Sequence, residues 1–222
     1  MKRRKYLTES SILVVILMLV GCVSIRAQQV KLTVMKDIER HGLTLTPVFQ
    51  ADNSIDEYEV VSALLNEIYL TGNYKSIVIT NPTCCEVEDG YVGSGAFKMY
   101  LDQLDPVSFD TLIDYAARNK QPLTFEKKFK LNTDYKIVPY ADVEKLFPQG
   151  MPEEGWKLFY SKYPGANGYI RLSRVGFNKT RDQAIVNTAW MRGPLHGNGS
   201  YVLLGKNNHS WKVLKTVTTW VS

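Results

Sequence analysis

The sequence predicts an α+β protein in which helices pack on a C-terminal antiparallel sheet, a meander of about four strands. Helical periodicity dominates the first two-thirds of the chain, whereas strand-like runs joined by short links fill residues 168–222. Because helices and strands are segregated, we expect the helices to cover one face of the sheet. Apolar residues make up 45% and charged residues 22% of the 222 residues, which excludes a disordered chain, a collagen, a coiled coil and a multi-span membrane protein.

The chain begins with the features of an export signal. Basic residues at positions 2–5 precede the apolar run Ile12–Val20, which is shorter than the about 20 apolar residues of a transmembrane helix. The run ends in Leu19-Val20-Gly21-Cys22, which resembles the bacterial lipobox. That resemblance implies cleavage before Cys22 and a diacylglycerol on its sulfur. We therefore expect a signal peptide over residues 1–21 and a lipid anchor at Cys22 that holds an exported protein in the cell envelope, in the periplasm or at the cell surface.

Two other ways of processing this N-terminal segment are possible. Cleavage after Ala27 would give a soluble secreted protein, and an uncleaved segment would remain as an anchor. The formal net charge of +5 comes largely from this segment, since residues 1–22 hold four basic residues and one acid, and the rest carries +2. The charge of the mature chain therefore gives no reason to expect a nucleic-acid partner.

The predicted elements begin after a stretch without sustained period, residues 22–50, which is read as a tether or as edge strands. A single α+β domain is expected over residues 51–222. Ser54-Ile55-Asp56-Glu57 is a capping-box pattern, and an apolar stripe follows to Ile68, so a helix is predicted there. The β-branched run Ser76–Thr80 predicts a strand.

Further helices are predicted from Asp105-Pro106, over Ala141–Phe147 and around Trp156–Tyr163, with a strand over Tyr135–Tyr140 between the first two. The strands of the predicted meander are Tyr169–Asn178, Gln183–Met191, Ser200–Lys206 and Ser210–Val221.

Two details of this meander follow from residue spacing. Ile170 and Leu172 differ in parity from Val175 and Phe177, so a β-bulge near Ser173-Arg174 is needed to bury both pairs on one face. Asn207-Asn208 predicts a tight hairpin, because asparagine tolerates a positive φ.

Several segments together resemble an uncharacterised family of bacterial exported proteins. The resemblance is strongest in the last third and rests on Leu172–Asn178 (LSRVGFN), the glycine-rich loop 192–199, Tyr201–Leu204 and the ending Trp220-Val221-Ser222. It implies an envelope location and a helix-plus-sheet domain. No catalytic or binding residue comes with it.

Candidate site residues are few. His196 lies in the glycine-rich loop, where the backbone can approach a ligand and histidine can act as a base, but a plain connection between strands explains the loop equally. Arg171 and Arg174, with Lys179 and Arg181, form a basic cluster that could bind an anion such as a lipid headgroup or a glycan carboxylate. A solvated face is the alternative.

Other chemistry is not indicated. The sequence has no C-x-x-C or H-x-x-x-H spacing, so neither a metal nor a cofactor is predicted. A disulfide between the adjacent Cys84 and Cys85 would be strained, which leaves a redox role or two small loop residues. The run Lys127-Lys128 with Lys130 reads as a solvated face. The aromatic residues of the C-terminal strands are expected to be mainly core, with a glycan platform as the alternative.

These observations favour a cell-envelope lipoprotein that acts as a non-enzymatic binding or interaction module. Its partners would be the membrane, through Cys22, and an envelope protein or glycan. The alternative is an envelope hydrolase with a site near His196, and a subunit of an envelope complex is a third class. The sequence does not specify an oligomeric state.

Overall fold

The computed structural model describes residues 54–70, 74–83, 100, 103–148 and 151–222. All of them belong to one compact unit, Leu45–Ser222. The predicted signal peptide, the tether, the lipidation site Cys22 and the pair Cys84-Cys85 lie outside the described residues.

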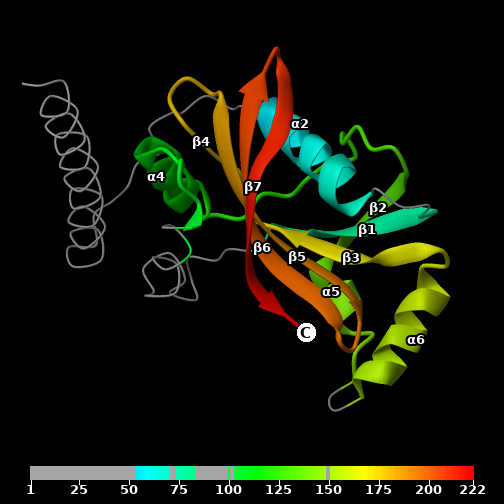
Figure 1. The fold of residues 1–222 in the computed structure, drawn as a ribbon. Coiled ribbons are helices and arrows are strands. Elements are labelled where there is room, and N and C mark those ends of the chain that lie inside the picture. Colours follow the sequence, from blue (N-terminus) through cyan, green and yellow to red (C-terminus); the bar gives the residue numbers. More distant parts are fainter. Residues whose placement is uncertain (1–53, 71–73, 84–99, 101–102, 149–150) are drawn as a thin grey trace, which may run out of the picture. The chain divides into compact units, whose positions relative to one another are not determined.

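A seven-stranded mixed sheet organises this unit (Figure 1). Its strands are β1 (Ser76–Asn81), β2 (Asp134–Pro139), β3 (Ala166–Leu172), β4 (Gly176–Phe177), β5 (Gln183–Gly193), β6 (His196–Asn207) and β7 (Ser210–Val221). They lie in the order β2-β1-β3-β5-β6-β7, with β4 also paired to β5. The α+β class is confirmed.

The sheet is larger than the predicted meander of about four strands. Strands β1 and β2 pair in parallel with each other, and β1 pairs in parallel with β3, whereas all pairs from β3 to β7 are antiparallel. Both extra strands were expected as strands, but parallel partners are far apart in sequence, and local periodicity does not reveal such pairing.

Helices cover both faces of the sheet, which corrects the expectation of one covered face. The helices are α2 (Ser54–Leu64) with the π-helical turn η1 (Leu65–Tyr69), α4 (Phe109–Arg118), α5 (Tyr140–Glu144) and α6 (Pro152–Lys162). Face A carries Val186 and Trp190 of β5 and is covered by α2 and η1. Face B carries Ala189 and Met191 of the same strand, and α5 and α6 cover part of it.

Each face has its own hydrophobic core. On face A, apolar residues of α2 and η1 pack with Phe125 and Phe129 and with inward residues of β1 and β3–β7. On face B, an aromatic cluster from α6 and β3 contains Trp156, Phe159 and Tyr169. Two buried faces require two apolar sets along the central strands, as the burial of consecutive residues in β5 shows.

The predicted bulge lies where the strand parity changes. Leu172 pairs with Thr188, and Gly176 pairs with Ile185. Four steps along β3–β4 therefore match three steps along β5, which is the one-residue insertion of a β-bulge. As a result, Val175 and Phe177 join Leu172 in the core of face A.

Two hairpins close the C-terminal meander. Asn208 and His209 both have positive φ, 46° and 64°, as a tight two-residue turn between β6 and β7 requires. The turn lies one residue later than predicted. Strand β6 begins at His196 rather than Ser200, because Gly197 and Gly199 pair with β5 and the predicted loop is only a Pro194-Leu195 turn.

Candidate functional site

The loop candidate His196 is the first residue of β6, opposite Gly193, and its side chain is exposed. Within the part of the chain that the structure describes, no hydrogen bond or ion pair orients its imidazole. The same residues contain no group of three or more His, Cys, Asp or Glu side chains that could hold a metal ion. Among the described residues, His196 therefore has no partner for base catalysis.

The two arginine candidates lie in different surroundings. Arg174 is in the bulge and reaches α2, whereas Arg171 is on face B beside α5. Of the other two members of the predicted basic cluster, Arg181 forms an ion pair with Asp56 and stacks on Phe177, and Lys179 donates its backbone N–H to Asp110. The cluster does not converge on a single anion site.

Glu57 of α2 is the centre of the contacts around the bulge. Its side chain is fully buried, and Oε1 accepts from Arg118 Nη1 at 3.1 Å and from Arg174 Nη2 at 2.7 Å. Oε2 accepts from the backbone N–H of Val175 at 3.1 Å. One carboxylate thus joins α2 to α4 and to the bulge.

Asp114 of α4 repeats this arrangement one strand segment later. It is fully buried, and its Oδ2 accepts from Arg118 Nε at 2.7 Å and from the Phe177 backbone N–H at 2.8 Å. Gly176 lies between Val175 and Phe177 and packs against α4, where an added Cβ would be 2.5 Å from the backbone nitrogen of Tyr115. The glycine is needed for this close approach.

Two neutral side chains complete the contacts to the bulge backbone. Asn119 accepts from the Arg174 N–H at 2.8 Å and donates to the Arg174 carbonyl at 3.1 Å. Ser173 Oγ accepts from the Asn187 N–H at 2.8 Å. Backbone groups that the bulge removes from the sheet ladder are satisfied in this way.

We call Glu57, Asp114, Arg118, Asn119 and Arg174 the bulge network. Its two carboxylates and two guanidiniums balance in charge, and the carboxylate of Glu57 and the guanidinium of Arg118 are almost fully buried. Buried charges are tolerated when they are paired and hydrogen-bonded. Of its buried side-chain atoms, Asp114 Oδ1 and Arg174 Nε have no hydrogen-bond partner. These groups therefore hold the fold together rather than form an open reactive site.

A second polar contact joins α2 to the extended segment 123–133. Glu126, Lys130 and Asn132 donate their backbone N–H groups to Tyr58, Ser62 and Asn66, which are four residues apart along the helix. These three side chains supply the hydrogen-bond acceptors that a neighbouring strand would supply. Sequence reasoning recognised only the apolar stripe of the helix and missed the polar one.

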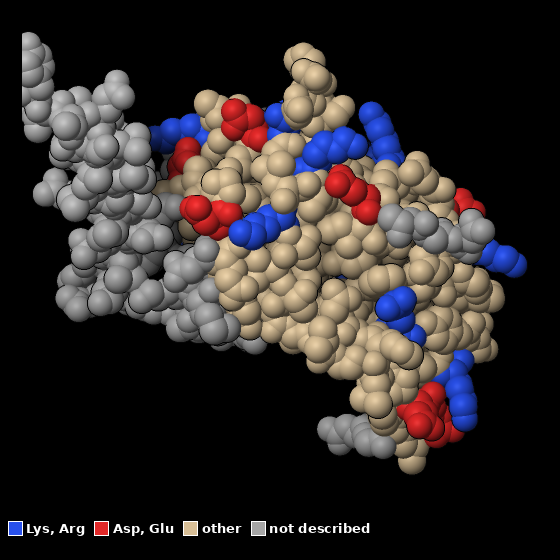
Figure 2. Space-filling view, in the orientation of Figure 1, with Lys and Arg blue, Asp and Glu red and all other residues tan. Residues whose placement is uncertain are grey.

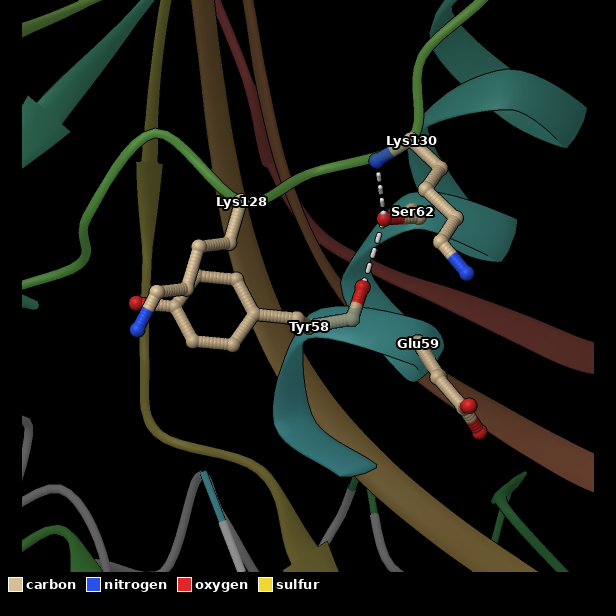
Figure 3. A pocket seen from close by; sticks show the side chains of 5 residues that line it. All are labelled: Tyr58, Glu59, Ser62, Lys128 and Lys130. Atoms are coloured by element: carbon tan, nitrogen blue, oxygen red, sulfur yellow. Dashed lines mark hydrogen bonds between the residues drawn. The ribbon is translucent and has the colours of Figure 1, made fainter. Parts of the chain in front are cut away.

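A shallow pocket lies at this contact (Figure 3). Tyr58, Glu59 and Ser62 of α2 line it together with Lys128 and Lys130, and Ser62 joins the Tyr58 carbonyl to the Lys130 N–H. Lys128 forms an exposed ion pair with Glu126, 2.9 Å between Nζ and Oε2. The predicted basic run is thus a solvated face over the buried Phe125 and Phe129.

Face B has a part that no described helix covers. Arg171, Ala189, Gly199 and Trp220 are paired in register across β3, β5, β6 and β7, so they form one row on this face. Arg171, Ala189 and Trp220 are all partly exposed. We call this row the open strip.

Arg171 at one end of the open strip is stacked, with its guanidinium carbon 4.1 Å from the ring centre of Tyr140. Among the described residues it has neither a salt-bridge nor a hydrogen-bond partner. Burial raises the pKa of the neighbouring Tyr169 to about 12, so this phenol stays uncharged at neutral pH. The carboxylate of Glu144 in α5 also acts on Tyr169, but no ion pair joins it to Arg171, so the five N–H donors of Arg171 have no bonded acceptor among the described residues.

Trp220 at the other end lies flat on glycine backbone. A Cβ on Gly199 would be 2.0 Å from the indole Nε1, and one on Gly197 would be 3.1 Å from Cζ3. Trp220 is 37% exposed, whereas the other three tryptophans are at most 8% exposed. The two glycines thus support one face of the ring and leave area on the ring open to solvent.

The space-filling view agrees with a weakly charged surface. In Figure 2, charged side chains gather along the upper part of the visible face, and a broad uncharged area with isolated basic groups occupies its middle. No helix among the described residues is long and apolar enough to span a membrane.

No protein-family model, no curated protein and no solved structure matches the chain.

Proposed function

We propose that this protein is a cell-envelope lipoprotein, anchored through Cys22, whose α+β unit is a non-enzymatic binding module. The binding surface would be the open strip on face B. One observation carries this proposal: the acids and arginines of the bulge network are occupied in structural contacts, whereas Arg171 on the open strip has unused donors.

The anchor is tested by the chemistry of the mature N-terminus. After expression of the full chain in a bacterium, mass spectrometry of the membrane fraction should find an N-terminal Cys22 with attached acyl chains. Cys22→Ala should leave the chain unacylated. A mature chain that begins at Gln28 in the soluble fraction would overturn the anchor and support secretion instead.

Binding is tested separately, with the chain lacking residues 1–21 and a delipidated envelope preparation. The protein should co-sediment with the envelope material, and Arg171→Met should reduce the retained fraction about tenfold, as expected from loss of a charge-assisted contact. The hydrolase alternative predicts soluble fragments that accumulate with time and disappear in His196→Ala. That result would replace the binding module with an enzyme.

A further inference from the structure

The open strip contains two kinds of group that meet a carbohydrate in complementary ways. Trp220 offers an aromatic surface, and Arg171 offers a guanidinium. Ala189 is small and partly exposed, whereas Gly199 is buried under the Trp220 ring. We infer that the open strip binds an oligosaccharide that carries a carboxylate. This inference deepens the proposed binding function and rests on it.

The tryptophan supplies the stacking surface. An indole is large and rigid, and contact with the apolar face of a pyranose buries much area at little cost in conformational entropy. The backbone of Gly197 and Gly199 supports the ring of Trp220 from below, which fixes its tilt before a ligand arrives. A ring held in this way has less freedom to lose on binding.

The arginine supplies the recognition of charge. A guanidinium binds a carboxylate through two parallel N–H···O bonds, which are stronger than bonds between neutral groups. Stacking on Tyr140 holds the guanidinium plane of Arg171 without using its N–H donors. Arg174 shows the contrast, because its Nη2 is already bonded to Glu57.

The spacing sets the length of the ligand. Strands β3 and β7 are three strand spacings apart, roughly 14 Å at about 4.8 Å per spacing. Both end side chains are long, so a disaccharide or trisaccharide spans the strip. The shared chemistry is a pyranose with a carboxylate, which could come from a uronic-acid polysaccharide or from the lactyl group of muramic acid.

The first experiment is a fluorescence titration of the chain lacking residues 1–21. The probes are trigalacturonate, its methyl ester, the N-acetylglucosamine–N-acetylmuramic acid disaccharide and inorganic phosphate. Trigalacturonate or the muramic-acid disaccharide should protect tryptophan emission from acrylamide, because Trp220 is the one partly exposed tryptophan. Which of the two binds more tightly identifies the source. The methyl ester should bind about tenfold more weakly.

Matched variants separate the two ends of the strip. Arg171→Met should weaken binding of the acidic probe about tenfold and leave binding of the methyl ester unchanged. Trp220→Leu lacks the fluorescent reporter, so its binding is measured by titration calorimetry, and it should weaken both. Arg192→Met is the control, since Arg192 stacks on Trp190 in the same manner but on face A, and it should bind as the wild type does. Circular dichroism checks that each variant is folded.

The outcomes distinguish this inference from the function on which it rests. If neither acidic probe protects Trp220 while envelope retention still depends on Arg171, the ligand class is wrong and the binding module stands. If phosphate competes as well as the acidic sugars, the strip is a simple anion site and the inference is overturned. If envelope retention is also absent, both proposals fall.

Discussion

Arg171 and Arg174 lie three residues apart along the chain, but the bulge between them places their side chains in different surroundings. Arg174 enters the bulge network and pairs with the buried Glu57, whereas Arg171 stays on face B with only the ring of Tyr140 beneath it. The bulge network is closed, buried and balanced in charge. The open strip is exposed and has donors without partners among the described residues. A basic residue therefore indicates a ligand only when the fold leaves its donors unused.

The largest effect should come from removing the charge at the centre of the bulge network. Glu57→Gln leaves the guanidiniums of Arg118 and Arg174 without their shared carboxylate, and we expect the free energy of unfolding to fall by about 3–5 kcal/mol. Chemical denaturation measures this. Glu59→Gln is the control on the same helix: it is exposed, its contact with Lys206 is 3.9 Å long, and it should change stability by less than about 1 kcal/mol. Equal effects would show that the network is not specially stabilising.

A smaller effect on stability, with a large effect on the strip, is expected for Gly199→Ala. The new methyl group would occupy the position of the Trp220 indole, so the ring must swing out, at a cost of about 1–3 kcal/mol. Acrylamide should then quench Trp220 more strongly, and binding of the acidic probe should be lost. Gly193→Ala, where the nearest contact is an ordinary 3.4 Å, should change neither. Unchanged quenching in Gly199→Ala would contradict the packing of the Trp220 ring on Gly199.

The turn between β4 and β5 should contribute a modest dependence of stability on pH. Hydrogen bonds from Asn178 and Thr180 lower the pKa of Asp182 below its ordinary 3.8. Because the folded pKa is lowered, this contribution is present above about pH 4 and is lost as the pH falls through the folded value. Asp182→Asn should therefore flatten the acid side of the stability profile slightly. A profile that stays unchanged would mean that these bonds are as strong with the protonated acid.

The smallest effect is expected at the residue that the sequence singled out. His196→Ala removes an exposed side chain without a hydrogen bond to the described residues, so stability should change by less than about 0.5 kcal/mol. Binding of the acidic probe should also be unchanged. Loss of binding in this variant would extend the open strip to the β5–β6 turn.

Local sequence pattern predicted the elements better than the sheet. The bulge was predictable because two apolar pairs of opposite parity must face one core, and the last hairpin because asparagine tolerates a positive φ. The start of β6 was not, since Gly197 and Gly199 read as a loop until Trp220 is seen to occupy the space above them. The parallel pairing of β1 with β2 and β3 joins segments too distant for any local signal.

In the candidate site too, local sequence identifies the residues but not their contacts. Arg171 and Arg174 were both named from sequence as one basic cluster, but only their opposite environments separate a structural residue from a free one. The partner of Arg174 is Glu57, 117 residues earlier, which the sequence pattern presents only as part of a capping box. No spacing rule connects positions so far apart.

Most helices and strands, and the bulge, follow from neighbouring residues and from the alternation of apolar side chains, so local sequence pattern predicts them. Which charges are buried together and which side chains remain available depends on contacts between distant segments, so only the folded structure reveals them. The function proposed here therefore rests on Arg171 and Trp220, which the pairing of β3, β5, β6 and β7 sets in one row.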